Sequence, residues 1–300
     1  MQSRILFSGA SGMLGTALRH SLASEFETLQ LVRRQPLSPS ELTWNPDSAR
    51  PFAQTNEFEG LTAAIHLSGA NLAGKRWTAA YKRELVESRV ASTRALAQAL
   101  AELSRPPQVL LVASGTGIYG NRGDEILDES SAPGTGFLAD LCRAWEEAAQ
   151  PAVQAGIRVV HLRCGPVLGG GGGALGKMLP IFRLGLGGPL GNGRQWMSWI
   201  ALADLIAAVR FLIADNQLTG PINMVAPEPV TNAEFTRALG RVLHRPAILP
   251  APAFALRLAL GDMADDALLA SARAVPKRLL DSGFQFRYPS IDEALREALA

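Results

Sequence analysis

Hydrophobic residues gather in five short runs along the chain, and these runs alternate with longer segments of helical periodicity. Each run is apolar almost without interruption, which is typical of parallel strands that are buried on both faces. The runs lie at residues 4–8, 28–32, 63–68, 109–114 and 158–164. Because helices between parallel strands form right-handed crossovers, this order predicts an α/β fold with a Rossmann-type, doubly wound parallel sheet.

The segments between the runs supply the helices and loops of this fold. Apolar or small residues recur every three or four positions in 78–103, and further helices are expected at 13–23 and 137–154. The polar segment 35–60 contains prolines and is expected to be a loop. Two glycine-rich segments, 165–178 and 185–200, are expected to form flexible walls of a binding site.

The chain changes character near residue 230. From there to the end, short helical pieces are separated by prolines, and no internal repeat is visible. This change predicts two domains: a dinucleotide-binding Rossmann domain of extended type at 1–229, and a small, mostly helical domain at 230–300 that caps the substrate site.

Composition and charge narrow the classes of partner. The chain has 300 residues, 47% of them hydrophobic, and a formal net charge of +2 without long runs of one sign. Neither a nucleic-acid surface nor a membrane surface is therefore expected, and a small molecule is the expected partner. The only cysteines are Cys142 and Cys164, with no cysteine or histidine cluster at metal-ligand spacing. This predicts no metal site and a reducing compartment, the cytoplasm.

A glycine pattern at the first strand carries the clearest chemistry. Gly9, Gly12 and Gly15 give G-x-x-G-x-x-G between a strand and a helix. In such a loop the first glycine permits a tight turn, the second lets the backbone approach a pyrophosphate, and the third lets the helix pack on the strand. The residues expected to face the phosphates are Ser11, Met13 and Leu14.

Two arginines follow the second strand, where an NAD-binding protein would offer an acidic residue to the ribose. Arg33 and Arg34 suit the 2′-phosphate of NADP instead, so NADP(H) is the expected cofactor. The alternative interpretation is that both arginines open a polar loop and are only solvated.

The motifs together resemble a known family. With the glycine loop, the runs "HLSGANLAGKRW", "LRCGPVLGGGGGALGKM" and "VPKRLLDSGFQFRYPS" are similar to an atypical, epimerase-family branch of the extended short-chain dehydrogenases/reductases, which include sugar-nucleotide epimerases. The resemblance implies an NADP-binding Rossmann domain followed by a C-terminal domain of undetermined role. Some relatives also carry a cell-division-inhibitor label.

The resemblance also implies positions for the rest of the cofactor. Leu67, Ser68 and Gly69 would line its adenosine and pyrophosphate side, and Val167 would close over the nicotinamide. Arg89 stands where relatives with "NVxGT" have asparagine, so its guanidinium is expected to reach the cofactor or to hold a carboxylate. Glu84 is the expected neighbour on the same helix, and the alternative for Arg89 is an ordinary surface position.

The general acid/base of this superfamily is missing. Its enzymes use a tyrosine and, four residues later, a lysine that lowers the tyrosine pKa, but no Tyr-x-x-x-Lys occurs here. Aligning "CRAWE" places Leu138 and Cys142 at the two positions. Ser114 matches the family serine that binds the reacting substrate oxygen. Tyr119 remains either a residue of the pocket wall or a stand-in acid.

A second cluster is a candidate substrate pocket. Trp196 and Trp199 follow a glycine-rich turn, and Arg183 precedes them, a mixture suited to a flat or anionic ligand. The alternative is that the indoles cover the domain junction as core residues.

Two functional hypotheses follow from these features. In the first, the protein is an NADP(H)-dependent oxidoreductase or epimerase that acts on a carbonyl or sugar-nucleotide-like substrate. In the second, it is a non-catalytic NADP(H) sensor or regulatory protein that acts through a protein partner or a second copy. The missing Tyr and Lys favour the second hypothesis more than the fold does.

Overall fold

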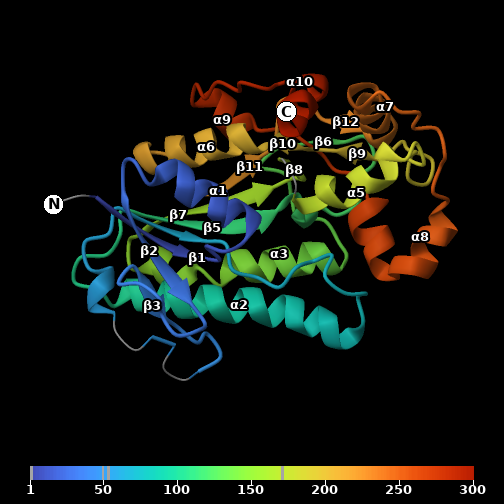
Figure 1. Cartoon of the computed structure of the whole chain (residues 1–300). Coiled ribbons are helices and arrows are strands. Elements are labelled where there is room, and N and C mark those ends of the chain that lie inside the picture. The colour runs from blue at the N-terminus through green and yellow to red at the C-terminus, as the bar shows by residue number, and fades with distance from the viewer. Residues whose placement is uncertain (1–2, 49–50, 53–54, 170–171) are drawn as a thin grey trace.

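A seven-stranded sheet forms the centre of the protein (Figure 1). The computed structural model describes residues 3–48, 51–52, 55–169 and 172–300. Every strand pair in this sheet is parallel. The strand order is β11 (Gly220–Met224), β7 (Arg158–Cys164), β5 (Val109–Gly115), β4 (Ala63–His66), β1 (Arg4–Ser8), β2 (Glu27–Val32) and β3 (Glu41–Thr43). The chain winds outward in both directions from β1 and β4, so the predicted doubly wound α/β fold is confirmed.

Helices cover both faces of the sheet, as the near-continuous apolar strands predict. In Figure 1, α1 (Met13–Leu22) and α6 (Leu202–Ala214) lie on one face, and α2 (Ala79–Ala101) and α3 (Phe137–Glu147) lie on the other. Side chains alternate along β5 accordingly. Leu111 packs into the core beside α1 and α6, whereas Leu110 packs into the core beside α2 and α4 (Gln150–Gln154).

The remaining elements build a smaller layer around a separate core. That core joins α5 (Gly173–Arg183), α7 (Asn232–Leu243) and α10 (Ile291–Leu299). The packing thus unites segments before and after residue 230, and the division at 229/230 stays a prediction. The other short elements are β6 (Ile126–Leu127), β8 (Val167–Leu168), β9 (Trp196–Met197), β10 (Ile200–Ala201), β12 (Val230–Thr231), β13 (Arg273–Ala274), α8 (Ala253–Leu260), α9 (Lys277–Asp281), η1 (Asn56–Phe58), η2 (Thr116–Tyr119) and η3 (Ala264–Leu268).

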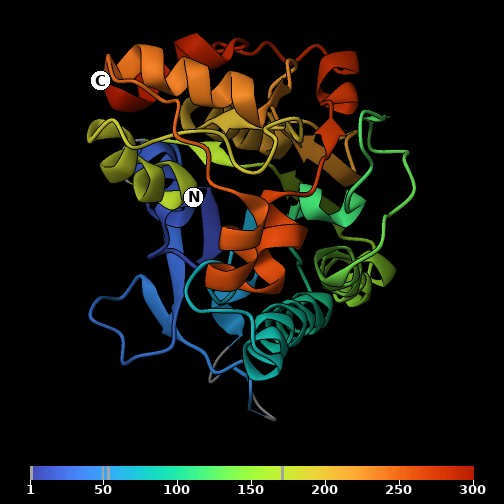
Figure 2. The same cartoon turned by 90° about the vertical axis from the view of Figure 1, so that its right-hand side faces the viewer.

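One part of the C-terminal segment reaches across to the sheet domain. Figure 2 shows α8 and η3 (orange) between the upper layer and α2. Met263 packs there against Trp77, Tyr81 and Leu141, and Lys82 of α2 forms an ion pair with Asp262 at 2.5 Å. The C-terminal segment therefore contacts the loop that follows β4, next to the carboxyl edge of the sheet.

The structure departs from the predicted elements at four places. β3 lies inside the segment expected to be a loop, and β11 and α6 were not predicted. The expected helix at 137–154 ends at Glu147 and resumes at Gln150. Pro151 has no amide hydrogen for a helical bond and fits only the first turn of a new helix. Of the glycine-rich walls, residues 170 and 171 lie outside the described residues.

No helix in the described ranges combines the length and the apolar character that crossing a bilayer requires.

A buried histidine connects β1, β4 and α2 beneath the glycine loop. The Nδ1 atom of His66 lies 2.5 Å from Ser8 Oγ, and its Nε2 atom lies 3.2 Å from Ser92 Oγ. The ring is fully buried, and this burial lowers the pKa of His66 to about 3. His66 is therefore a neutral, hydrogen-bonded core residue and not a catalytic base.

This buried histidine predicts a pH dependence of stability. In the unfolded chain His66 takes up a proton near its ordinary pKa, whereas in the folded protein it stays neutral until about pH 3. Its contribution is fully present above about pH 6.5 and falls by roughly 1.4 kcal/mol per pH unit below that. Urea unfolding between pH 7 and pH 5 measures this decline in the free energy of unfolding. In His66→Gln the decline should be shallower than in the wild type, by roughly 1.4 kcal/mol per pH unit below about pH 6.5. His20 is exposed, so His20→Gln should leave the decline of the wild type unchanged. Equal slopes in the two variants would contradict the neutral, buried state of His66.

Candidate functional site

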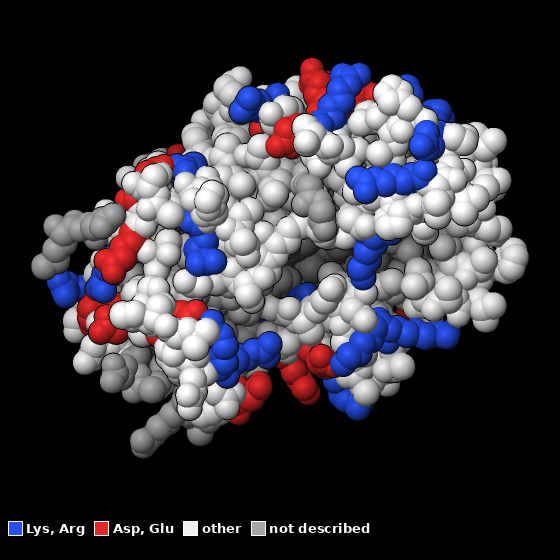
Figure 3. Space-filling view, viewed as in Figure 1, with Lys and Arg blue, Asp and Glu red and all other residues white. Residues whose placement is uncertain are grey.

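The glycine loop closes the carboxyl end of β1, on the side to which the strands point and where the surface is hollowed (Figure 3). Gly9 has a positive φ of 72°, and a Cβ on it would lie 2.7 Å from the carbonyl carbon of Leu67. A Cβ on Gly15 would lie 2.3 Å from the carbonyl oxygen of Gly9. Packing therefore requires both glycines.

Gly12 differs from its two partners. Its φ is −72°, and a Cβ on it would meet only Gly9 O, at 3.4 Å. The fold itself does not need glycine there, so the open space is free for a ligand at the N-terminus of α1. Ser11 beside it is exposed, and Met13 and Leu14 are half-buried at the start of the helix.

Gly172, just before α5, and Val167 of β8 lie near the start of α1. A Cβ on Gly172 would lie 2.8 Å from Met13 Sδ, so this glycine lets the segment before α5 approach α1. Val167 is buried in the same core, beside Met13 and Leu14. The structure therefore places Val167 near the start of α1, and its expected role of closing over the nicotinamide stays a prediction.

The two arginines after β2 have different surroundings. Arg34 donates two hydrogen bonds to the carboxylate of Glu41 on β3, at 2.7 and 2.6 Å. These bonds hold the pKa of Glu41 at about 2. Arg33 is exposed, and within the described ranges no hydrogen bond or ion pair engages it. Arg33 is therefore the guanidinium available for a ligand at the end of β2.

The loop after β4 lies against a buried arginine. Leu67, Ser68 and Gly69 follow the strand directly, and a Cβ on Gly69 would lie only 3.0 Å from Arg89 Cζ. The surface alternative for Arg89 is therefore wrong, because its side chain is 6% exposed.

The expected pairing of Arg89 with Glu84 is not formed. Glu84 instead pairs with Lys75, at 3.2 Å. Residues five apart on an α-helix point about 140° away from each other, so Glu84 lies on the outer side of α2 while Arg89 points inward. The expectation that Glu84 holds Arg89 at the cofactor site is therefore wrong.

Ser114, at the end of β5, is held by a buried ion pair. Its Oγ donates to Glu146 Oε1 at 2.8 Å. Glu146 in turn accepts from Arg163 Nε and Nη2, both at 2.9 Å. Burial alone would lower the pKa of Arg163, but the bonds to Glu146 raise it above its ordinary value. Arg163 therefore remains charged, and the pair fixes Ser114.

Tyr119 is bound into the same network. Its side chain is fully buried, and its hydroxyl accepts from Arg163 Nη1 at 3.1 Å and donates to Asn223 Oδ1 at 2.7 Å. Burial raises the pKa of Tyr119 above its ordinary value. A buried hydroxyl that already has these partners is poorly suited to protonate a substrate, so the contacts favour the packing role over that of a stand-in acid.

The positions of the missing Tyr and Lys contain an apolar side chain and a buried thiol. Leu138 packs against Gly117, where an added Cβ would lie 3.1 Å from Leu138 Cβ. Cys142 is buried beside Ser114 and Gly115, and burial raises the pKa of its thiol to about 11. Neither side chain replaces the expected acid/base chemistry.

The second predicted cluster is not assembled at this edge. Trp199 is fully buried in the core of α5, α7 and α10, so its assignment to a substrate pocket is wrong and the core alternative holds. Trp196 donates to Asp124 at 2.8 Å and lies under Arg273, whose Cζ is 4.1 Å from the ring centroid. Arg183 is exposed at the end of α5.

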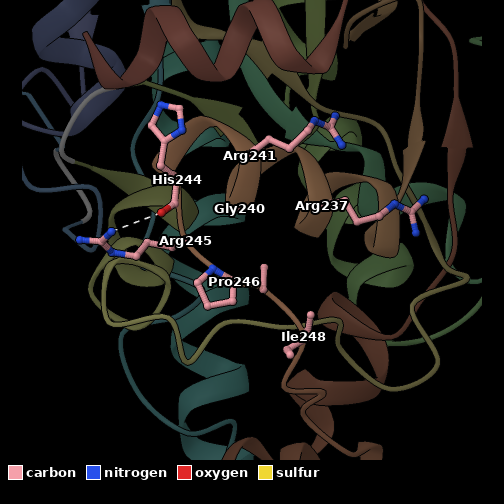
Figure 4. A pocket seen from close by; sticks show the side chains of 8 residues that line it. Arg237, Gly240, Arg241, His244, Arg245, Pro246 and Ile248 are labelled. Atoms are coloured by element: carbon pink, nitrogen blue, oxygen red, sulfur yellow. Dashed lines mark hydrogen bonds between the residues drawn. The ribbon is translucent and has the colours of Figure 1, made fainter.

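A separate surface pocket of about 610 Å³ lies at the C-terminal end of α7. Its lining includes Arg237, Arg241, His244 and Arg245. In Figure 4 the guanidinium groups of Arg237 and Arg241 point away from the side chains of His244 and Arg245. Arg241 is also paired with Asp292, at 2.8 Å. Because these cations diverge, the pocket is a weaker candidate than the carboxyl edge of the sheet.

Sequence reasoning missed the roles of Glu146 and Arg163. Their pairing joins a helix to a strand 17 residues later, and no local pattern marks it. The available signal was a charged residue within the apolar run 158–164, since a charge in a buried strand needs a partner.

The buried pair predicts a large loss of stability when one partner is removed. Glu146→Gln leaves Arg163 without a counter-charge and should lower the free energy of unfolding by roughly 3–5 kcal/mol. The more exposed pair of Arg122 and Glu125 supplies the control. Glu125→Gln should change the free energy of unfolding by less than about 1 kcal/mol. Similar urea midpoints for the two variants would contradict the role of the buried pair.

The glycine geometry predicts different effects at two neighbouring positions. Gly15→Ala forces a methyl group against Gly9 O and should cost roughly 1–3 kcal/mol of stability, measured by urea unfolding. Gly12→Ala should fold as stably as the wild type but lose dinucleotide binding, because its methyl group fills the space for the phosphates. A Gly12→Ala variant that binds dinucleotide normally would contradict this assignment.

Comparisons with known proteins agree with this geometry. The family described as "NAD dependent epimerase/dehydratase family" matches residues 5–225 of the chain, and a domain family of unknown function matches residues 251–298. An epimerase family protein of Mycobacterium bovis is 46% identical over 97% of this chain and 96% of its own length. The mouse epimerase family protein SDR39U1 is 37% identical over 99% of this chain and all of its own length.

A solved structure extends the similarity to the fold. The crystal structure of human epimerase family protein SDR39U1 with NADPH has a TM-score of 0.89 and 34% identity, and the match covers 98% of both chains. The family resemblance predicted from the motifs is thereby confirmed. The chain belongs to the NAD dependent epimerase/dehydratase family, in the branch of the epimerase family proteins related to SDR39U1.

Proposed function

We propose that the protein binds NADP(H) and acts as an oxidoreductase or epimerase on a small molecule with a reactive hydroxyl or carbonyl carbon. The observation that carries this proposal is the exposed Arg33 at the end of β2, which no side chain in the described part of the chain neutralises. The space beside Gly12 and the NADPH bound to the human relative support the same cofactor. Free Cys142 and Cys164 fit a reducing compartment, and we propose the cytoplasm.

The residues of the edge fit the parts of NADP(H) in sequence across the sheet. Amide groups at the start of α1 would bind the pyrophosphate, and Arg33 would bind the 2′-phosphate. Leu67 and Ser68 would line the middle of the dinucleotide, and Val167 would cover the nicotinamide. The bound cofactor supplies or accepts the hydride.

Ser114 would orient the substrate in a specific way. Because it donates its only hydroxyl hydrogen to Glu146, its remaining capacity is that of an acceptor. It would therefore accept a hydrogen bond from a substrate hydroxyl or from a water molecule. With Leu138 and Cys142 at the usual acid/base positions, water is the proposed proton carrier.

One observation favours a second function. The positions that carry the acid/base pair in catalytic relatives contain an apolar side chain and a thiol with a raised pKa. A protein with this site could bind NADP(H) as a signal and pass it to a protein partner or a second copy. The contact of Met263 with the loop after β4 gives such a signal a route to the C-terminal segment.

Cofactor preference is the first test. Arg33→Ala should weaken NADPH binding roughly tenfold to a hundredfold and leave NADH binding unchanged, because it removes a charge-assisted bond to the 2′-phosphate. Arg34→Ala should have a smaller effect, since Arg34 is held by Glu41. Titration calorimetry measures both constants. Equal affinity of the wild type for NADPH and NADH would contradict the proposal.

Single-turnover oxidation of NADPH against carbonyl metabolites and nucleotide sugars then separates the two functions. Oxidation with any of these substrates supports the enzyme. Tight NADPH binding without oxidation by the whole panel supports the regulatory protein.

A further inference from the structure

One helix of the C-terminal segment is apolar and yet buries none of its side chains. α8 has the sequence AFALRLAL, in which Arg257 is the polar exception, and none of its residues is buried. Phe254 and Leu258 lie one turn apart and are 73% and 75% exposed. An apolar helix normally packs most of its surface into a core. α8 therefore presents an apolar surface that the described part of the chain does not cover.

Two neighbouring segments extend this surface to the end of α5. The chain at 185–191 runs beside the chain at 246–253, where the amide of Leu249 donates to the carbonyl of Gly187 at 3.0 Å. Both segments carry apolar side chains that are at least half exposed. Together with α5 and α8 they form one apolar face, made by Ile181, Leu184, Leu186, Ile248, Leu249, Phe254 and Leu258.

The charges on this face are positive. No Asp or Glu occurs in 173–203 or in 235–261, the two stretches that build it. Arg183 and Arg245 are exposed there, and Arg245 Nε donates to the carbonyl of Arg183 at 3.0 Å, so the two residues are neighbours. Figure 3 shows the surface over α5 and α8, at the right, as white and bordered mainly by Lys and Arg. Composition predicted no membrane surface because the two signs balance over the whole chain, but the fold brings these two acid-free stretches together.

These charges favour an anionic lipid surface over a second copy as the occupant. In a symmetric dimer the face would meet itself, and the arginines of the two copies would repel each other because its two stretches supply no acidic residue. A protein partner inserts its anchors into a groove, whereas Phe254 and Leu258 stand out from the surface. A lipid surface accepts protruding apolar side chains, and its phosphates attract the arginines.

We infer that this apolar and basic face binds an anionic membrane surface, with α8 lying along the interface. The inference is independent of NADP(H) binding. Both helices of the face are tied to the loop after β4: Lys177 Nζ of α5 donates to the carbonyl of Ala73 at 2.5 Å, and a Cβ on Gly261, at the end of α8, would lie 3.2 Å from Arg76 Nε. The face therefore adjoins the carboxyl edge of the sheet, and the candidate site would open beside the bilayer.

Sedimentation of the full chain with lipid vesicles tests this inference. Vesicles of equal parts phosphatidylglycerol and phosphatidylcholine should be bound roughly tenfold more tightly than vesicles of phosphatidylcholine alone, and added salt should weaken the binding. Phe254→Ser combined with Leu258→Ser removes two inserting side chains and should weaken binding to the anionic vesicles roughly tenfold or more. Arg183→Gln combined with Arg245→Gln should weaken it to a similar extent.

Matched controls change exposed residues away from the face. Leu37→Ser, in the loop between β2 and β3 with the side chain 81% exposed, and Arg94→Gln, on α2, should bind the anionic vesicles as the wild type does. Because every substituted side chain is exposed, the melting temperatures should stay close to that of the wild type.

Three results would overturn the inference. The first is a wild type that does not bind the anionic vesicles, and the second is equal binding by the face variants and the controls. The third is a dimer, seen by sedimentation velocity, that Phe254→Ser combined with Leu258→Ser dissociates while neither protein binds vesicles. That result would assign the face to a second copy of the chain.

Discussion

The ion pair of Glu146 and Arg163 is the interaction on which the site depends. It joins α3 to β7 beneath the carboxyl edge of the sheet, and it fixes both Ser114 and Tyr119. Through Tyr119 the network continues to Asn223 on β11, whose Nδ2 donates to the carbonyl of Val275 at 2.9 Å. One buried charge pair therefore connects Ser114, at the end of β5, to the C-terminal segment, and a charge pair at that depth holds its geometry firmly.

The rest of the site divides into groups that the fold uses and groups that it leaves free. Gly9 and Gly15 are needed for packing, Arg34 is neutralised by Glu41, and Tyr119 has its hydroxyl partners. Gly12, Arg33 and the Nε of Arg89 have no such internal use in the described structure. The free groups lie along the line from β2 across β1 to β4, which is the path expected for a dinucleotide on a doubly wound sheet.

The sequence predicted the parts of this arrangement that local patterns determine. Continuous apolar runs marked five strands correctly, and glycine spacing marked the tight turn between β1 and α1, because both depend on neighbouring residues. β11 was missed because Pro221 and Asn223 interrupt its apolar character. The Glu146–Arg163 pair, the burial of Trp199 and the unpartnered Nε of Arg89 in the described structure depend on contacts between distant elements. No periodicity or motif records such contacts.

A crystal structure of the protein grown with NADPH tests the central claim most directly. We predict that the 2′-phosphate lies within hydrogen-bonding distance of Arg33, that the pyrophosphate lies at the N-terminus of α1, and that the nicotinamide ring faces Ser114. NADPH bound at the glycine loop with its nicotinamide half turned away from Ser114 would contradict this arrangement, as would a 2′-phosphate held by groups other than Arg33.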